Sequence, residues 1–97
     1  MEHRLYLSDE FLDQAEDIEF YYNSLTPNLG DRFIDQLYSL LQKLEERPLT
    51  WQKVSPTIHR ALVPGFPYSV FFRLKEEQLV EVLSVLHQAS DPGKRPR

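Results

Sequence analysis

The fold is decided by the stretch Phe66-Pro67-Tyr68-Ser69-Val70-Phe71-Phe72-Arg73-Leu74. It is rich in aromatic and β-branched residues, and Val70 and Phe72 recur at the two-residue period of a strand. Pro67 fits at the entry, because a proline has no N–H to donate inside a sheet ladder. We therefore expect a largely buried central strand here.

One further strand is predicted on each side of this run. Residues 58–63 form one candidate, separated from the central strand by the turn signal Pro64-Gly65. Residues 79–86 form the other, after the polar turn 75–78. Because consecutive strands with short connections pair side by side, an antiparallel meander is predicted.

Two amphipathic helices are predicted upstream. Residues 3–7 alternate as a short first strand, and Ser8 stands as the N-cap of a helix ending near Ser24. Thr26-Pro27 is predicted to start a second helix, which ends before Pro48. Apolar residues recur three and four positions apart in both helices: Phe11, Ala15, Ile18, Tyr22 and Leu25 in the first, and Phe33, Leu37, Leu40 and Leu44 in the second.

The predicted order is β-α-α-β-β-β, an α+β fold in a single domain over residues 1–97. The short connection makes the helices a hairpin. We expect this hairpin to pack on one face of a small, mostly antiparallel sheet, with the opposite face left partly open. Residues 49–57 are expected to form a loop, and residues 88–97 a mobile tail.

Composition excludes several classes of protein. With 97 residues, 41% hydrophobic and 27% charged, the chain is typical of a soluble globular protein. It has no cysteine, and its three histidines have no ligand spacing, so neither a metal nor another cofactor is expected. It has no apolar run long enough for a membrane span or signal peptide, so we expect a cytoplasmic protein without a membrane partner.

Charge is distributed unevenly along the chain. Residues 1–46 carry 11 acidic and 3 basic side chains, a balance of −8, whereas residues 47–97 carry 4 acidic and 8 basic, a balance of +4. The isoelectric point of about 5.3 is low for a protein that binds polyanions. Direct DNA binding by the chain alone is therefore not expected.

Several motifs follow one another in a fixed order: the pair Tyr21-Tyr22, the segment Pro27–Phe33, Pro48, the pattern Arg60-x-x-Val63-x-x-Phe66-Pro67-Tyr68-x-Val70, and the pattern Val82-x-x-Val85-Leu86-His87-x-x-x-Asp91-Pro92. In these features the chain resembles the ParE/RelE superfamily of toxins from type II toxin-antitoxin systems, and most of all its ParE-like branch. The resemblance implies the RelE/ParE-like toxin fold and a cognate antitoxin protein as partner. It also implies one of two activities: inhibition of DNA gyrase, or ribosome-dependent cleavage of messenger RNA.

The nuclease alternative requires a base, an acid and cationic groups near the scissile phosphate. Its candidate catalytic residues are Lys53, Arg60, Arg73 and His87, with Tyr68 as a possible stacking ring. Resemblance to RelE-like enzymes implies that Arg60 contacts phosphate and that His87 transfers a proton. Gln88-Ala89-Ser90 stands where such relatives commonly carry an arginine pair or a tyrosine, so a nuclease built on the rest is expected to be weak.

The preferred interpretation is a ParE-like toxin that binds a protein target such as DNA gyrase. Its expected target-binding residues are the cations of the second half: Lys53, Arg60, Arg73, Lys94, Arg95 and Arg97. A structural alternative for Arg60 is a side chain that simply faces solvent or pairs with Glu81 across the sheet. An inactive family member that only binds its antitoxin is the third interpretation.

The antitoxin is expected to bind apolar side chains left exposed on the sheet, either with an amphipathic helix in a groove or with a strand added at an edge. The predicted contacts are Tyr68, Phe71, Leu83 and Leu86. A structural alternative for Tyr68 is a core ring with its hydroxyl at the rim.

Overall fold

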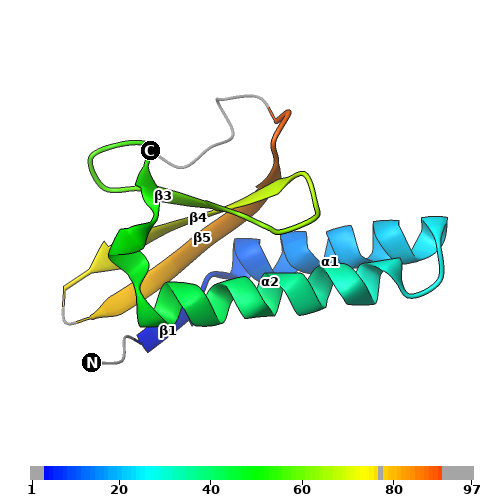
Figure 1. The fold of residues 1–97 in the computed structure, drawn as a ribbon, viewed down its shortest axis with the longest axis horizontal. Coiled ribbons are helices and arrows are strands. Elements are labelled where there is room, and N and C mark those ends of the chain that lie inside the picture. Colours follow the sequence, from blue (N-terminus) through cyan, green and yellow to red (C-terminus); the bar gives the residue numbers. More distant parts are fainter. Residues whose placement is uncertain (1–3, 77, 91–97) are drawn as a thin grey trace.

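The computed structural model describes residues 4–76 and 78–90. The elements follow the predicted order, with a 3-10 turn and a short strand added after the helices (Figure 1): β1 Arg4–Leu7, α1 Asp9–Leu25, α2 Leu29–Glu46, η1 Pro48–Thr50, β2 Gln52–Lys53, β3 His59–Leu62, β4 Tyr68–Lys75 and β5 Leu79–His87. They form a helical hairpin against a five-stranded sheet of order β1-β5-β4-β3-β2. The predicted α+β class is confirmed.

The sheet is mostly antiparallel, as predicted. β3, β4 and β5 form the antiparallel meander around the central β4, while β1 runs parallel to β5. Phe71 lies opposite Ser84 and Phe72 opposite Val82, so Leu83 is the extra residue of a β-bulge. The residues of β2 were predicted to be part of a loop. They pair with β3, but a strand of only two residues is too short to show a two-residue period in the sequence.

Helix α1 begins where the sequence predicts. The backbone N–H of Phe11 donates to Ser8 Oγ at 3.0 Å, and the same hydroxyl donates to the carbonyl of Leu83 at 2.8 Å. The first bond satisfies a free helix N–H, and the second attaches the helix start to β5. Ser8 thus fixes where α1 leaves the sheet.

The predicted start of the second helix is wrong by two residues. Helix α2 begins at Leu29 with Asn28 as its N-cap, in the left-handed region at φ 70°. Thr26 instead ends α1, with its backbone N–H donating to the carbonyl of Tyr22 at 3.1 Å. Asparagine tolerates the left-handed conformation, and this lets the chain reverse within three residues.

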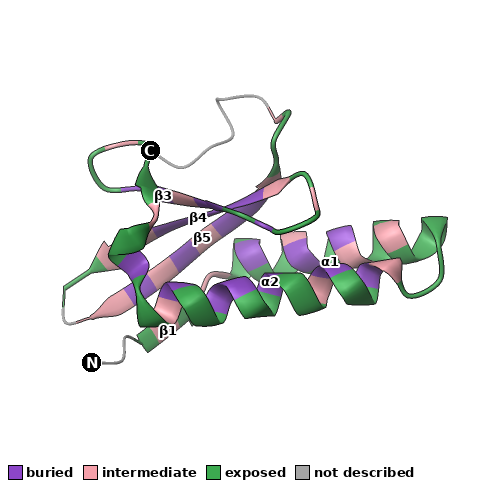
Figure 2. Ribbon diagram, in the orientation of Figure 1, coloured by how far each residue is buried: buried purple, intermediate pink, exposed green. Residues whose placement is uncertain are grey.

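One core lies between the hairpin and the sheet. Buried side chains from both helices and the inner face of the sheet line it (Figure 2): Phe11, Ala15 and Ile18 from α1; Phe33, Leu37, Leu40, Leu41 and Leu44 from α2; and Ala61, Val70, Phe72, Val80, Val82 and Val85 from the strands. Apolar burial on this scale is the main stabilising contribution of the fold.

The opposite face of the sheet is partly open, as predicted. Strand alternation places Arg60, Phe71 and Ser84 in one row facing away from the helices. In that row Phe71 is only 1% exposed, and Ser84 is buried too. Leu62, one row further, is 52% exposed. The open area is thus confined to part of this face.

No helix within residues 4–76 and 78–90 has the length and hydrophobicity needed to span a membrane. The predicted mobile tail is described only for residues 88–90. There the N–H of Gln88 donates to the carbonyl of Pro67, and the N–H of Ser90 to that of His87, both at 2.9 Å. The rest of the predicted tail, with Lys94, Arg95 and Arg97, lies outside the described residues.

Candidate interaction sites on the sheet

A cationic hollow lies at the end of the sheet formed by β2, β3 and the last residues of β4. Its volume is about 580 Å³, and its lining includes Lys53, His59, Arg73 and Lys75. The fold therefore brings Lys53 and Arg73, two of the predicted site residues, to one cavity. Lys75 was not predicted, although it follows Arg73 by two residues and so shares its face of the strand.

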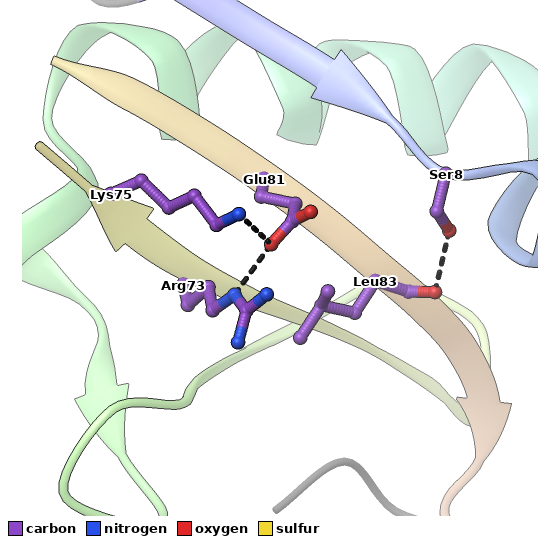
Figure 3. A network of polar contacts seen from close by, with 5 residues as sticks. All are labelled: Ser8, Arg73, Lys75, Glu81 and Leu83. Atoms are coloured by element: carbon purple, nitrogen blue, oxygen red, sulfur yellow. Dashed lines mark hydrogen bonds and ion pairs between the residues drawn. The ribbon is translucent and has the colours of Figure 1, made fainter. Parts of the chain in front are cut away.

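Glu81 of β5 orders two of these cations. Figure 3 shows Arg73 and Lys75 converging on its carboxylate: Arg73 Nε donates to Oε1 at 2.5 Å, and Lys75 Nζ lies 3.7 Å from the same oxygen. One carboxylate faces two cations, and Lys53 adds a third across the hollow. The hollow thus keeps a net positive charge, suited to an acidic partner surface.

Arg60 does not line this cationic hollow. Its Nη2 donates to Gln52 Oε1 at 3.3 Å on the neighbouring strand, so the alternative in which it pairs with Glu81 is wrong. With Leu62, Ser69 and Gln88 it lines a separate depression of about 190 Å³ on the face away from the helices. The register explains both facts, because Arg60 is level with Gln52 and Phe71, whereas Glu81 is level with Arg73.

The four predicted antitoxin contacts do not form one surface. Phe71 is buried, so the expectation that it is exposed for a partner is wrong. Tyr68 packs among the rings of Tyr22 and Phe33 on the helix side of the sheet. Leu83 and Leu86 are partly exposed.

Leu62 is an exposed residue of the outer face that was not predicted from the sequence. Leu62, Ser69 and Leu86 are aligned across β3, β4 and β5. The two leucines therefore flank a small serine on the outer face, a shallow apolar strip. The alternation of side chains along the strand could have indicated this strip, because Leu62 lies two residues after Arg60 and so faces the same side of the sheet.

His87 and Tyr68 form a pair at the end of β5, with ring centroids 5.2 Å apart in an edge-to-face arrangement. His87 Nδ1 accepts a hydrogen bond from the N–H of Ala89 at 2.9 Å, which leaves Nε2 as the protonated nitrogen of the neutral ring. Burial, and next the neighbouring Tyr22 and Tyr21, raise the pKa of Tyr68.

The two residues implied for nuclease chemistry lie on different sides of the sheet. His87 is level with Tyr68, whose ring packs on Phe33 of α2, and so belongs to the helix side. Arg60 belongs to the row that faces away from the helices. Within the described part of the chain, no group of three or more histidine, cysteine or acidic residues could hold a metal ion.

Solved structures similar to this chain include chains from a ParDE and a RelBE toxin-antitoxin system. A chain of the chromosomal ParDE toxin-antitoxin system of P. aeruginosa has a TM-score of 0.77 and 15% identity, covering 88% of this chain and 95% of that one. A mutant of the E. coli toxin RelE in the free state has a TM-score of 0.67 and 18% identity, covering 92% of this chain and 86% of that one. A chain of the intact E. coli RelBE toxin-antitoxin complex has a TM-score of 0.62 and 17% identity, covering 92% of this chain and 99% of that one. At these identities the likeness shows the fold alone.

The sequence itself identifies the family. No curated protein sequence matches the chain. The family model described as ParE toxin of the type II toxin-antitoxin system parDE matches residues 5–92, nearly the whole length. The fold and this match agree with the resemblance in the motifs, and the chain belongs to the ParE toxin family of type II toxin-antitoxin systems.

Proposed function

We propose that this ParE-like toxin inhibits growth by binding a protein target such as DNA gyrase in the cytoplasm, and that a cognate antitoxin neutralises it. Family membership supports the toxin, and the likeness to a chain of the RelBE complex supports an antitoxin partner. The single observation that carries the mode of action is the cationic hollow of Lys53, Arg73 and Lys75.

The hollow suits binding better than catalysis. A nuclease needs its base, acid and phosphate contacts converging on one phosphate. Arg60 and His87 diverge to the two sides of the sheet, and Glu81 holds Arg73 and Lys75 in place. A set of cations at the rim of a sheet can instead align an acidic surface of a protein. RelE-like cleavage of messenger RNA remains the alternative to test.

For the antitoxin we propose the strip of Leu62 and Leu86 with Leu83 beside it. These side chains are partly or largely exposed on the face away from the helices. The strip alone is small compared with the surface of roughly 1,600 Å² that a stable complex buries. A neutralising partner therefore has to contact further parts of the toxin.

Inducible expression in a bacterial host tests the proposed function. The test variant combines Lys53→Gln and Lys75→Gln, and the matched control removes two exposed cations near the end of α2, Lys43→Gln and Arg47→Gln. We expect the wild type and the control to stop growth and inhibit gyrase supercoiling in purified form. The hollow variant should lose both effects while keeping its thermal midpoint.

Two results would contradict this proposal. If the wild type cleaves messages during translation, and Arg60→Ala or His87→Ala abolishes the cleavage, the chain is a RelE-like nuclease. If the wild type binds its antitoxin but neither stops growth nor affects supercoiling, it is an inactive family member.

A further inference from the structure

Strand β4 extends beyond the start of β3, so part of its edge has no neighbouring strand (Figure 1). His59, the first residue of β3, lies opposite Phe72, and β4 continues to Lys75. A longer β3 would place Thr57 opposite Leu74. Among the described residues, however, no main-chain hydrogen bond joins these two. Both line the cationic hollow, so the hollow occupies the place of the missing strand.

The turn before β3 directs the chain away from β4. The carbonyl of Ile58 accepts hydrogen bonds from the N–H of Val54 at 2.9 Å and the N–H of Ser55 at 3.4 Å. The N–H of Ile58 in turn donates to Ser55 Oγ at 3.1 Å. These bonds close the connection between β2 and β3 on itself, so residues 54–57 do not extend β3 along β4. The opening is therefore built into the fold.

The main-chain groups of Leu74 point into this opening. Along an antiparallel strand, successive residues direct their N–H and C=O groups alternately to the two sides. The carbonyl of Tyr68 accepts from Val63 on the β3 side, and the carbonyl of Pro67 accepts from Gln88 on the β5 side. Counting in twos from Tyr68 places the groups of Leu74 on the β3 side. An extended peptide can bond both groups, whereas a phosphate group has no donor for the carbonyl.

The side chains around the opening define which peptide fits it. Leu74 packs against the core on the helix side, so Arg73 and Lys75 face the other side of the sheet. Leu49 of η1 also lines the hollow and is 70% exposed, so its apolar surface is accessible to a partner. Because Arg73 and Lys75 share the single carboxylate of Glu81, their side keeps a net positive charge.

We propose that the cationic hollow binds an extended acidic segment of the target protein, which adds to the edge of β4 at Leu74. The inference rests on the proposed function and names the part of the target that the hollow binds. Side chains of the segment alternate between the two faces of the sheet. The residue level with Leu74 is apolar and packs on Leu49, and its two neighbours are acidic and face Arg73 and Lys75. The recognised pattern is therefore acidic, apolar, acidic.

The first experiment measures the affinity of the purified toxin for purified DNA gyrase by calorimetry. The test variant is Leu49→Ser, and the matched control is Leu25→Ser at the end of α1, where the leucine is 58% exposed. We expect Leu49→Ser to weaken binding about tenfold, as loss of an apolar interface anchor does, and the control to stay within about twofold of wild type. Because Leu49 is exposed, the variant should keep the thermal midpoint of the toxin. Unchanged affinity would overturn the inference and leave the proposed function intact.

The second experiment tests the free edge of β4 with a peptide probe and does not depend on gyrase. The probe is the acetylated and amidated peptide Ser-Glu-Ile-Glu-Ser, and its control carries an N-methyl group on isoleucine, which removes the N–H meant for the carbonyl of Leu74. We expect the probe to slow hydrogen exchange of the Leu74 amide, measured by NMR on the isotope-labelled toxin. The control peptide should bind about tenfold more weakly. A peptide with glutamine in place of glutamate should also bind more weakly, and with less dependence on salt concentration.

The possible failures of these tests at the edge of β4 are distinguishable. Equal binding of the probe and its N-methylated control would overturn the inference, as would a probe that contacts the strip of Leu62 and Leu86 instead. A short single-stranded RNA that binds in the hollow in preference to the peptide would also overturn it, in favour of the nuclease alternative. A toxin that binds the probe at Leu74 but does not bind gyrase would overturn the proposed target and support the docking of an acidic segment.

Discussion

Replacing Gly30 with alanine should loosen the helical hairpin on which the sheet packs. Gly30 lies in the first turn of α2, where this helix approaches the end of α1. A Cβ there would stand 2.1 Å from the carbonyl oxygen of Glu19 and 2.7 Å from Cγ of Asn23. The Glu19 oxygen is backbone and cannot rotate away, so the two helices must separate by roughly 1.3 Å or more to restore an ordinary contact.

The expected loss of stability is about 2 kcal/mol. Overpacking of this kind typically costs about 1–3 kcal/mol. Separation of the helices also strains the bond in which the N–H of Gly30 donates to Asn23 Oδ1 at 2.7 Å, worth about 1 kcal/mol. Against this, alanine is favoured over glycine inside a helix by about 1 kcal/mol. For a domain of this size the net loss lowers the thermal midpoint by roughly 10 °C.

Thermal and urea unfolding followed by circular dichroism measures this loss. Two variants separate its causes. Asn23→Ala removes the hydrogen bonds without adding an atom and should cost about 1 kcal/mol. Gly65→Ala adds a Cβ with nothing within 4 Å, at φ +79°, and should cost only the left-handed conformation, about 1–2 kcal/mol. A Gly30→Ala variant as stable as the wild type would refute the reasoning.

Three further predictions concern the core, the cationic hollow and pH. Phe72→Ala empties a fully buried position in the central strand and should cost about 3–5 kcal/mol in urea unfolding; a loss below about 1 kcal/mol would mean that the site collapses freely. Glu81→Gln removes the carboxylate shared by Arg73 and Lys75, and because both cations are substantially exposed, stability should change by less than about 1 kcal/mol; a larger loss would show a stronger network. Burial, and next Tyr21, raise the pKa of Tyr22 above its usual 10.0, and that of Tyr68 is raised likewise. The unfolded chain therefore releases these protons first, so stability should be unaffected by the two groups below about pH 10 and fall as pH rises above it, less steeply in Tyr22→Phe; the same slope in both proteins would contradict the assignment.

Elements with a strong local signal were predictable from the sequence. The alternation of Val70 and Phe72 located the central strand, and Ser8 located the start of α1. Both are local effects, because period and capping depend on residues close in the chain. The apolar stripe by which α2 contacts the core was predictable for the same reason.

Features set by tertiary contacts were not predictable. Asn28 replaces Thr26 as the cap because a left-handed residue reverses the chain. The bulge at Leu83 and the burial of Phe71 depend on strand register, which no local pattern specifies. The grouping of Lys53 with Arg73, apart from Arg60, likewise depends on which strand ends meet.

The most direct test of the central claim, that this toxin acts by binding a protein and not by cutting RNA, is a supercoiling assay with purified toxin, gyrase and antitoxin. The account predicts that the toxin inhibits supercoiling, that the antitoxin restores it, and that a parallel translation reaction contains only intact messages. Full supercoiling in the presence of the toxin, together with cleaved messages in the translation reaction, would contradict it.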